Sequence, residues 1–318
     1  MLYSVILLVQ LLNYSNEKIN EPSSTPVPRW GHVLVYDPVR NTMLLFGGRA
    51  VTDNYFDDTW IWDGKEWNKK DLKGPSARGF CAVTFHEGRK SIILHGGRGN
   101  NSVTYSDTWE WDGEKWSLLQ ADSDYKADHH HMVYIAPEQR ILAFGGWDGT
   151  KVTGETWSWT NMSWKKLNVA SPPKRAAYGM AYDRTLNRVK LYGGLWVDGQ
   201  YADIWEWYNG SWNLKGGSYD NSSLDHHSLF YDEKLRYVLG FGGKNYRYKA
   251  QNNTFRIHEG SLLTVTSNGP SARYSFGIAY DSKMESAYLF GGKELKGEIQ
   301  IALNDFWKWD GKTWTKIQ

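Results

Sequence analysis

The stretch DTWEWDGEKW, residues 107–116, decides the fold, because near copies of it occur at four other places along the chain. The copies are DTWIWDGKEW at 58–67, ETWSWTNMSW at 155–164, DIWEWYNGSW at 203–212 and DFWKWDGKTW at 305–314. With three tryptophans each, the five stretches hold fifteen of the 18 tryptophans of the chain. A further copy, TFRIHEGSLL at 254–263, keeps the pattern with the smaller residues Phe255, Ile257 and Leu262.

Each copy predicts a β-hairpin whose three indoles share one face. A two-residue loop at Gly113–Glu114 places Trp111 opposite Trp116, because the turn fixes which residues face each other. Trp109 precedes Trp111 by two residues and therefore points to the same side of the strand. Each buried indole removes on the order of 200 Å² from water. We therefore expect every indole face to be covered by the next sheet.

A glycine doublet precedes each copy and sets the period of the repeat. The second glycines are Gly48, Gly97, Gly146, Gly194, Gly243 and Gly292, so successive units are 48 or 49 residues apart. Two apolar runs stand before each doublet, such as RWGHVLVYD at 29–37 and TMLLFGG at 42–48, and both are typical of buried strands. Six units of four short strands indicate sheets stacked around an axis.

This pattern resembles the kelch repeat family of β-propellers. PSARYSFGIAYDSKMESAYLFGG at 270–292, followed by the tryptophan hairpin at 305–314, carries the signature of that repeat. The resemblance implies an all-β, six-bladed propeller with four antiparallel strands per blade. We expect an N-terminal segment at 1–27 and blades at 28–72, 73–121, 122–170, 171–218, 219–268 and 269–318. Because the first and last units each own all their strands, we expect the ring to close by side-chain packing, without an exchanged strand.

Composition excludes several classes of protein. The net charge is +2, the pI is about 8.3, and no block of five like charges occurs, so neither nucleic acid nor an anionic membrane surface is an expected partner. The single cysteine, Cys81, rules out a disulfide framework and a paired-cysteine metal or redox motif. We expect a monomer without a cofactor.

The N-terminal residues predict the location of the protein. MLYSVILLVQLL at 1–12 is too short to span a bilayer but fits the core of a signal peptide, which predicts a secreted or extracytoplasmic protein. The alternative is a cytoplasmic protein in which residues 3–12 form an added strand or a tail. A secreted glycoprotein also fits the six N-x-[ST] sequons, at Asn13, Asn100, Asn161, Asn209, Asn221 and Asn252.

The first strands of the units supply candidate residues for the central channel. Alignment on the glycine doublets selects Arg29, His32, Arg78, His131, Arg175, Tyr178, His227 and Arg273. Units three and five read DHHHM at 128–132 and LDHHS at 224–228, and imidazole with carboxylate is a common metal shell. Adjacent histidines on a strand point to opposite faces, however, and such histidines also serve to bond a neighbouring blade. We therefore assign no metal site.

The loops after the doublets supply candidate ligand-binding residues. Cationic and aromatic side chains predominate there, and such side chains anchor protein interfaces and, for tryptophan, stack on sugars. We select Arg49, Arg98, Trp147, Trp196, Tyr201, Tyr246 and Arg247. The alternative is that these rings fold over blade edges and serve packing alone.

Two functional classes fit the sequence. The first is a non-catalytic binding module that presents these loops to a protein or peptide, or secondarily to a glycan. The second is an enzyme acting on a carbohydrate with His, Asp and Arg at the channel mouth. Galactose oxidase and the sialic acid epimerases share the repeat type, but the former needs a cysteine crosslinked to tyrosine beside copper, and Cys81 lies within an inner strand. We assign no catalytic residue, and the binding module is the leading interpretation.

Overall fold

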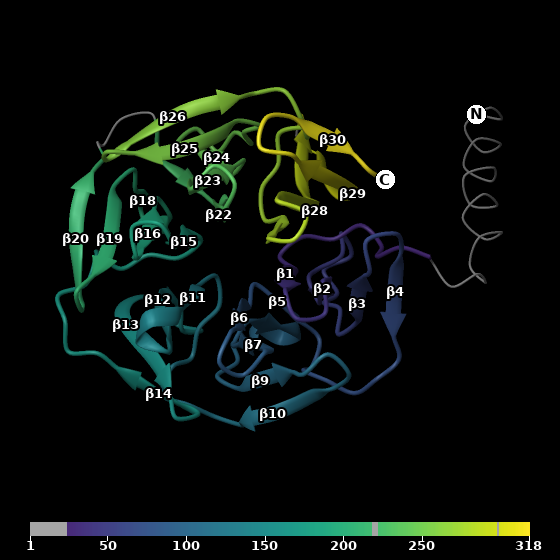
Figure 1. Ribbon diagram of the computed structural model, residues 1–318, viewed down its shortest axis with the longest axis horizontal. Helices are drawn as coiled ribbons and strands as arrows, with labels where there is room; N and C mark the ends of the chain where they lie inside the picture. Colours follow the sequence, from purple (N-terminus) through teal and green to yellow (C-terminus); the bar gives the residue numbers. More distant parts are fainter. Residues whose placement is uncertain (1–23, 218–221, 298) are drawn as a thin grey trace, which may run out of the picture.

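The computed structural model describes residues 24–217, 222–297 and 299–318. Six four-stranded antiparallel sheets stand around a central axis, which confirms the predicted six-bladed, all-β kelch-type propeller (Figure 1). The expected signal-peptide core and the alternative strand at 3–12, like Asn13 and Asn221, lie outside the described residues. Across the part that is described, we find no helix with the length and apolar character needed to cross a membrane.

Each blade uses four strands that follow one another in the chain. Blades 1 and 2 contain β1 (Val33–Asp37), β2 (Thr42–Phe46), β3 (Thr59–Trp62) and β4 (Trp67–Lys70), then β6 (Ala82–His86), β7 (Ser91–His95), β9 (Thr108–Trp111) and β10 (Trp116–Gln120). Blades 3 and 4 contain β11 (His131–Ile135), β12 (Arg140–Trp147), β13 (Val152–Thr160) and β14 (Ser163–Lys166), then β15 (Gly179–Asp183), β16 (Arg188–Tyr192), β19 (Ile204–Tyr208) and β20 (Ser211–Gly216). Blades 5 and 6 contain β22 (Ser228–Asp232), β23 (Tyr237–Phe241), β25 (Thr254–His258) and β26 (Ser261–Thr266), then β27 (Gly277–Asp281), β28 (Ser286–Lys296), β29 (Ile299–Trp309) and β30 (Trp314–Lys316).

Short pairs of strands lie between these blade strands on the loops. They are β5 (Arg78–Gly79) with β8 (Arg98–Gly99), β17 (Leu195–Trp196) with β18 (Gly199–Gln200), and β21 (Leu224–Asp225) with β24 (Lys244–Asn245). Two single-turn 3₁₀ helices, η1 (Asn100–Ser102) and η2 (Ala136–Glu138), complete the described elements.

The tryptophan hairpins have the predicted register. Trp111 pairs with Trp116 in blade 2, and the equivalent tryptophan pairs form in blades 1, 3, 4 and 6. Blade 5 keeps the register with Ile257 opposite Leu262. Because the turn glycines Gly64, Gly113 and Gly311 have φ between 95° and 104°, they supply the left-handed backbone that the tight turns need.

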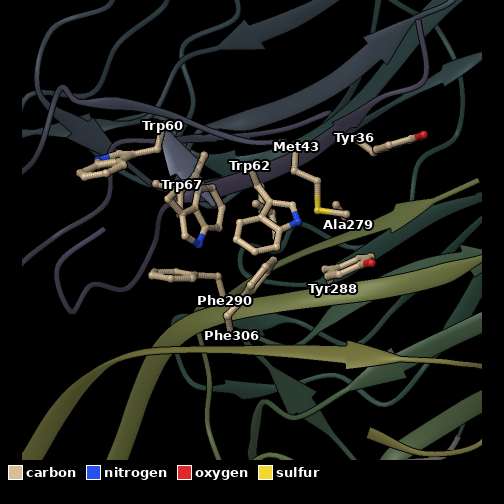
Figure 2. Packing of buried hydrophobic residues seen from close by; sticks show 11 residues of the cluster. Tyr36, Met43, Trp60, Trp62, Trp67, Ala279, Tyr288, Phe290 and Phe306 are labelled. Carbon is tan, nitrogen blue, oxygen red and sulfur yellow. The ribbon is translucent and has the colours of Figure 1, made fainter. Parts of the chain in front are cut away.

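A neighbouring sheet covers each indole face, as expected, but it belongs to the preceding blade and not to the next one. Trp60, Trp62 and Trp67 of blade 1 form a buried cluster with blade 6, in which the rings of Trp62 and Phe306 meet nearly edge-on at 5.0 Å (Figure 2). The other four tryptophan hairpins pack into apolar clusters at their own seams. The tryptophan repeat is therefore the apolar layer that joins neighbouring blades.

Threonine hydroxyls accept the hydrogen bonds of buried indole N–H groups in this layer. At four seams the indole N–H that opens the fourth strand donates to a buried threonine of the preceding blade, at 2.8–3.0 Å, and the acceptors are Thr59, Thr108, Thr156 and Thr254. At the seam between blades 4 and 5, Leu262 and Ile204 replace the indole and the threonine. At the seam between blades 6 and 1, Trp67 keeps the indole, but Phe306 stands at the threonine position and the N–H of Trp67 has no hydrogen-bond partner among the described residues.

Replacing Thr254 with valine is expected to destabilise the protein by about 1–3 kcal/mol, because the buried N–H of Trp314 loses its acceptor at nearly constant volume. Urea denaturation followed by tryptophan fluorescence measures the change. The exposed Thr264 on β26 provides the control, and its valine variant should stay within about 0.5 kcal/mol of the wild type. Equal effects of the two variants would contradict the role of the hydrogen bond.

The glycine doublets connect neighbouring blades through backbone hydrogen bonds. The second glycine of each doublet donates its N–H to a carbonyl of the next blade at 2.8–2.9 Å, as Gly48 does to Arg78. The first glycine lies against the same carbonyl, since a Cβ on Gly47 would stand 2.3 Å from the oxygen of Arg78. Gly292 bonds Arg29 in the same way, so blades 6 and 1 are joined like the others. The predicted closure without strand exchange is confirmed for the described residues, and backbone hydrogen bonds support it in addition to side chains.

Candidate binding face around the channel

The strand order gives the propeller two different faces. The turns between the first and second strands and between the third and fourth strands lie on one face of the ring. The loops that follow the glycine doublets connect the second and third strands, so they lie on the opposite face, which we call the doublet face. Most of the loop residues chosen from the sequence belong to this face.

A closed ring of backbone hydrogen bonds surrounds the axis at the doublet face. Each blade contributes one residue, which donates its N–H to the preceding blade's residue and accepts from the next, at 2.6–3.0 Å. All six have positive φ, between 52° and 65°. They are Gly31, Phe80, His129, Ala177, His226 and Ser275. This central ring fixes the side chains of the six blades relative to one another where the channel opens.

The four arginines assigned to the channel lie elsewhere. Arg29, Arg78, Arg175 and Arg273 are buried, and each forms a two-pronged ion pair with the aspartate that starts its own tryptophan hairpin. Arg273, for example, donates to the two carboxylate oxygens of Asp305 at 2.6 and 2.8 Å and to the carbonyl of Gly291 at 3.0 Å. The placement of these arginines in the channel is therefore corrected: they clamp the doublet to the third strand within a blade.

Aromatic residues cover these buried guanidinium groups. The ring of Tyr201 lies 4.0 Å from the guanidinium of Arg175, and Tyr105 and Phe56 lie 3.7 and 4.3 Å from Arg78 and Arg29. Tyr201, chosen from the sequence as a ligand-binding residue, therefore has a packing role inside blade 4. The centroid of the Tyr201 ring is 5.7 Å from that of Trp196, a residue that is 39% exposed.

A second ring of side chains surrounds the central ring. In every blade the residue before the central-ring position pairs, strand-like, with the first residue after the doublet. The residues after the doublets are Arg49, Arg98, Trp147, Leu195, Lys244 and Lys293. Four cations thus follow one another over blades 5, 6, 1 and 2, and Trp147 and Leu195 occupy blades 3 and 4. The doublet face has a cationic arc and an apolar arc.

Aromatic rings lie beside the cationic arc, and two of its four cations, Arg49 and Lys244, pair with the carboxylates of Asp53 and Asp225. Lys293 lies 4.4 Å from the ring of Trp30, while Lys244 lies 5.1 Å from Tyr274. Burial lowers the pKa of Lys293, and the positive charges of Arg49 and Lys244 lower it further. Among the described residues Lys293 forms no ion pair, whereas Arg49 contacts Asp53 at 2.8 Å. The arc therefore presents a cation whose charge is not neutralised by a bound carboxylate.

Two histidine–aspartate pairs stand at the centre of the face. His129 and His226 belong to the central ring, and their imidazoles meet nearly perpendicular at 5.4 Å. The Nδ1 atoms lie 2.5 Å from Asp128 and Asp225, respectively. Burial lowers the pKa of His226, although the hydrogen bond that its imidazole donates to Asp225 opposes this. The sequence did indicate the DHH stretches, but it gave no sign that histidines 97 residues apart would face each other.

The other inner-strand candidates lie either in the wall of the channel or at the seams between blades. His32 and His227 are buried, and burial lowers the pKa of each to about 3, so both are neutral at physiological pH. His32 accepts the N–H of Gly277 across the closure seam at 3.2 Å, and Tyr178 bonds the backbone of blade 3. His131 lines the channel, one residue after His130, which holds the position equivalent to His32.

The channel itself is a cavity of about 330 Å³ lined by the six first strands, and Cys81 is part of its wall. Burial raises the pKa of the Cys81 thiol to about 12, so the thiol stays protonated. Over the described ranges no group of three or more His, Cys, Asp or Glu residues is arranged to hold a metal.

The remaining loop candidates, Tyr246 and Arg247, are exposed in the loop after Lys244. The guanidinium carbon of Arg247 lies 5.1 Å from the centroid of the Tyr246 ring.

The fold, with its doublet joints, defines a six-bladed kelch propeller. A family model described as the KLHDC2/KLHL20/DRC7 Kelch-repeats domain matches residues 4–194, which is more than half of the chain. The protein therefore belongs to this family of kelch-repeat domains. A solved structure described as the structure of YjhT is similar with a TM-score of 0.68 and 14% identity, over 93% of this chain and 99% of that one. At that identity the likeness shows the fold alone. No curated protein matches the chain.

Proposed function

We propose that the protein is a non-catalytic kelch binding module whose doublet face binds an acidic segment of a partner protein or peptide. Kelch domains typically bind proteins, and this chain belongs to such a family. The observation that most supports this proposal is the cationic arc on four adjacent blades, which the central ring holds in place. The arc consists of Arg49, Arg98, Lys244 and Lys293. A rigid scaffold that presents loops in this way is the usual arrangement of binding sites.

The arc favours a ligand that combines carboxylates with apolar or aromatic groups. A ligand carboxylate would neutralise the ammonium group of Lys293, which lacks an acidic partner among the described residues. The rings of Trp30 and Tyr274 offer flat apolar surfaces beside that group. Aromatic and arginine side chains in such positions commonly dominate the binding energy of an interface. The apolar arc of Trp147 and Leu195 provides room for the uncharged part of the same segment.

The experiment compares a fluorescent peptide containing three aspartates interspersed with leucine and phenylalanine, its asparagine counterpart, and an array of acidic and neutral glycans. We expect the aspartate peptide to bind and the Lys244→Leu, Lys293→Leu double variant to bind it at least about tenfold more weakly. Lys283, exposed on the opposite face, provides the control variant Lys283→Leu, which should bind like the wild type. Equal binding of the aspartate and asparagine peptides would contradict the proposal, and retention of acidic glycans alone would change the ligand class.

A second candidate is catalysis on a carbohydrate, and the facing pairs His129–Asp128 and His226–Asp225 favour it. An imidazole oriented by a carboxylate is a common general base or acid. Consumption of a sugar substrate by the wild type, lost in folded His129→Gln and His226→Gln variants, would support this function over the binding module.

A further inference from the structure

The seam between blades 4 and 5 differs from the other five seams. Elsewhere, two tryptophans of the following blade cover the preceding sheet, as Trp111 and Trp116 cover blade 1. At this seam Ile257 and Leu262 stand in the tryptophan positions, and their side chains are much smaller. Two indoles that fill the outer part of every other seam are therefore absent here.

The opposite wall of this seam is charged. Blade 1 presents the cross-strand pair Leu44 and Ile61 to its neighbour's tryptophans, whereas blade 4 presents Lys190 and Glu206 at the equivalent positions. The six residues equivalent to Lys190 are Leu44, Ile93, Leu142, Lys190, Leu239 and Tyr288. Lys190 is the only charged one, and the exposed fraction of its side chain is 7%.

The buried charges form a loose cluster around one carboxylate. Glu206, whose side chain is 8% exposed, contacts Arg188 at 2.7 Å, Lys190 at 3.4 Å and Lys215 at 3.9 Å. Asp183 lies 3.6 Å from the ammonium group of Lys190 and also accepts the backbone N–H of Leu186. The carboxylate of Glu206 is thus shared by three cations. Both contacts of the Lys190 ammonium group are longer than charge-assisted hydrogen bonds usually are.

A crevice of about 540 Å³ lies over this cluster, on the face opposite the doublet loops. Arg188, Lys190, Lys215 and Arg236 line it, together with the carboxylates of Asp183, Glu206 and Glu259. Glu259 and Arg236 are both exposed, and the other charged groups of the lining are three cations and two carboxylates, which leaves an excess of positive charge. Ile257 and Tyr237 provide an apolar wall. A volume of this size is within the range of small-molecule sites.

We propose that this crevice, which we call the blade 4–5 crevice, binds a small organic anion. Its carboxylate, sulfonate or phosphate head contacts Lys190, Arg188 and Lys215, and its apolar body lies in the space that two indoles occupy at other seams. Burying a lysine and a glutamate without such a ligand is costly, and an apolar pair of similar size is often as stable or more stable. Five seams of the same protein have an uncharged residue at the position of Lys190, which shows that the fold itself does not need the charge.

The test uses 8-anilinonaphthalene-1-sulfonate as the anionic probe and N-phenyl-1-naphthylamine as its uncharged analogue, each titrated into the full chain by fluorescence. Two variants address the site. Ile257→Trp fills the crevice with the side chain that five other blades carry, and Lys190→Leu with Glu206→Ile installs an uncharged pair like that of blade 1. Lys308, equivalent to Glu206 at a seam closed by tryptophans, supplies the control Lys308→Leu.

We expect each site variant to weaken binding of the sulfonate at least about tenfold, Lys308→Leu to leave it unchanged, and the uncharged analogue to bind at least about tenfold more weakly. Because the paired Leu–Ile variant should melt at or above the wild-type temperature, it keeps the test informative if Ile257→Trp folds poorly. Unchanged sulfonate binding in the folded Leu–Ile variant, or equal binding of the two dyes, would overturn the proposal. The site lies on the other face from the cationic arc, so Lys244→Leu with Lys293→Leu should not affect it.

Discussion

Replacing Arg273 with leucine is expected to destabilise the protein by about 3–5 kcal/mol, because it leaves a partly buried carboxylate without its cation. The guanidinium of Arg273 bonds both oxygens of Asp305, the carbonyls of Gly291 and Ser271, and the hydroxyl of Ser271. Leucine fills much of the volume but satisfies none of these acceptors. Chemical denaturation at pH 7, with the change in midpoint converted through the denaturant slope, measures the loss.

The pH dependence identifies the cause of this loss. Burial alone would raise the pKa of Asp305, but the hydrogen bonds and charge of Arg273 outweigh it, and the pKa is lowered. A carboxyl whose folded-state pKa is depressed contributes stability above its unfolded pKa of about 3.9, and that stability is lost as the pH falls through the folded-state value. The penalty of Arg273→Leu should therefore shrink below about pH 4.

Two further variants separate the ion pair from general effects of charge. Arg273→Leu combined with Asp305→Leu should recover part of the stability, because no unpaired charge remains. Arg247→Leu, at an exposed loop position, should change the free energy of unfolding by less than about 0.5 kcal/mol. A loss for Arg273→Leu that stays constant between pH 7 and pH 3 would show that packing, and not the ion pair, sets the effect.

The sequence predicted those features that depend on local geometry. The pairing of Trp111 with Trp116 follows from a turn of fixed length, and six units follow from the spacing of glycine doublets, so both were correct. The buried arginines were misplaced because the position of a residue before a strand does not state where its side chain points. Arg273 meets Asp305, 32 residues further along the chain, and that contact depends on how the blade folds.

The arrangement of the doublet face depends on closure of the whole ring. Left-handed backbone at Phe80 and Ala177 is not indicated by their residue types, since such φ values favour glycine or asparagine. Yet these residues belong to the central ring that brings His129 to His226. The cations after the doublets were visible in the sequence, whereas their grouping on adjacent blades beside Trp30 and Tyr274 appears only once six units are joined.

Replacing Trp309 with alanine is expected to destabilise the protein by about 3–5 kcal/mol, because it opens a cavity at the seam between blades 5 and 6. Trp309 is fully buried, and its ring lies 5.5 Å from that of Trp314. Its indole N–H has no hydrogen-bond partner among the described residues, so the variant loses packing and no polar contact. Urea unfolding monitored by far-ultraviolet circular dichroism measures the change without relying on tryptophan fluorescence.

Trp307 provides the matched control, since it belongs to the same hairpin but is only partly buried. Its alanine variant should cost clearly less than Trp309→Ala, even though its N–H donates to Asp305 at 2.7 Å. Ile257 occupies the equivalent position in blade 5, but there it lines a crevice together with Lys190 and Glu206. Trp309, in contrast, packs in an apolar cluster with Leu239 of blade 5. Trp309→Ile should therefore also destabilise the protein, because the smaller isoleucine side chain leaves an empty space against the apolar wall of blade 5. Wild-type stability of Trp309→Ile would contradict the view that indole volume holds neighbouring blades together.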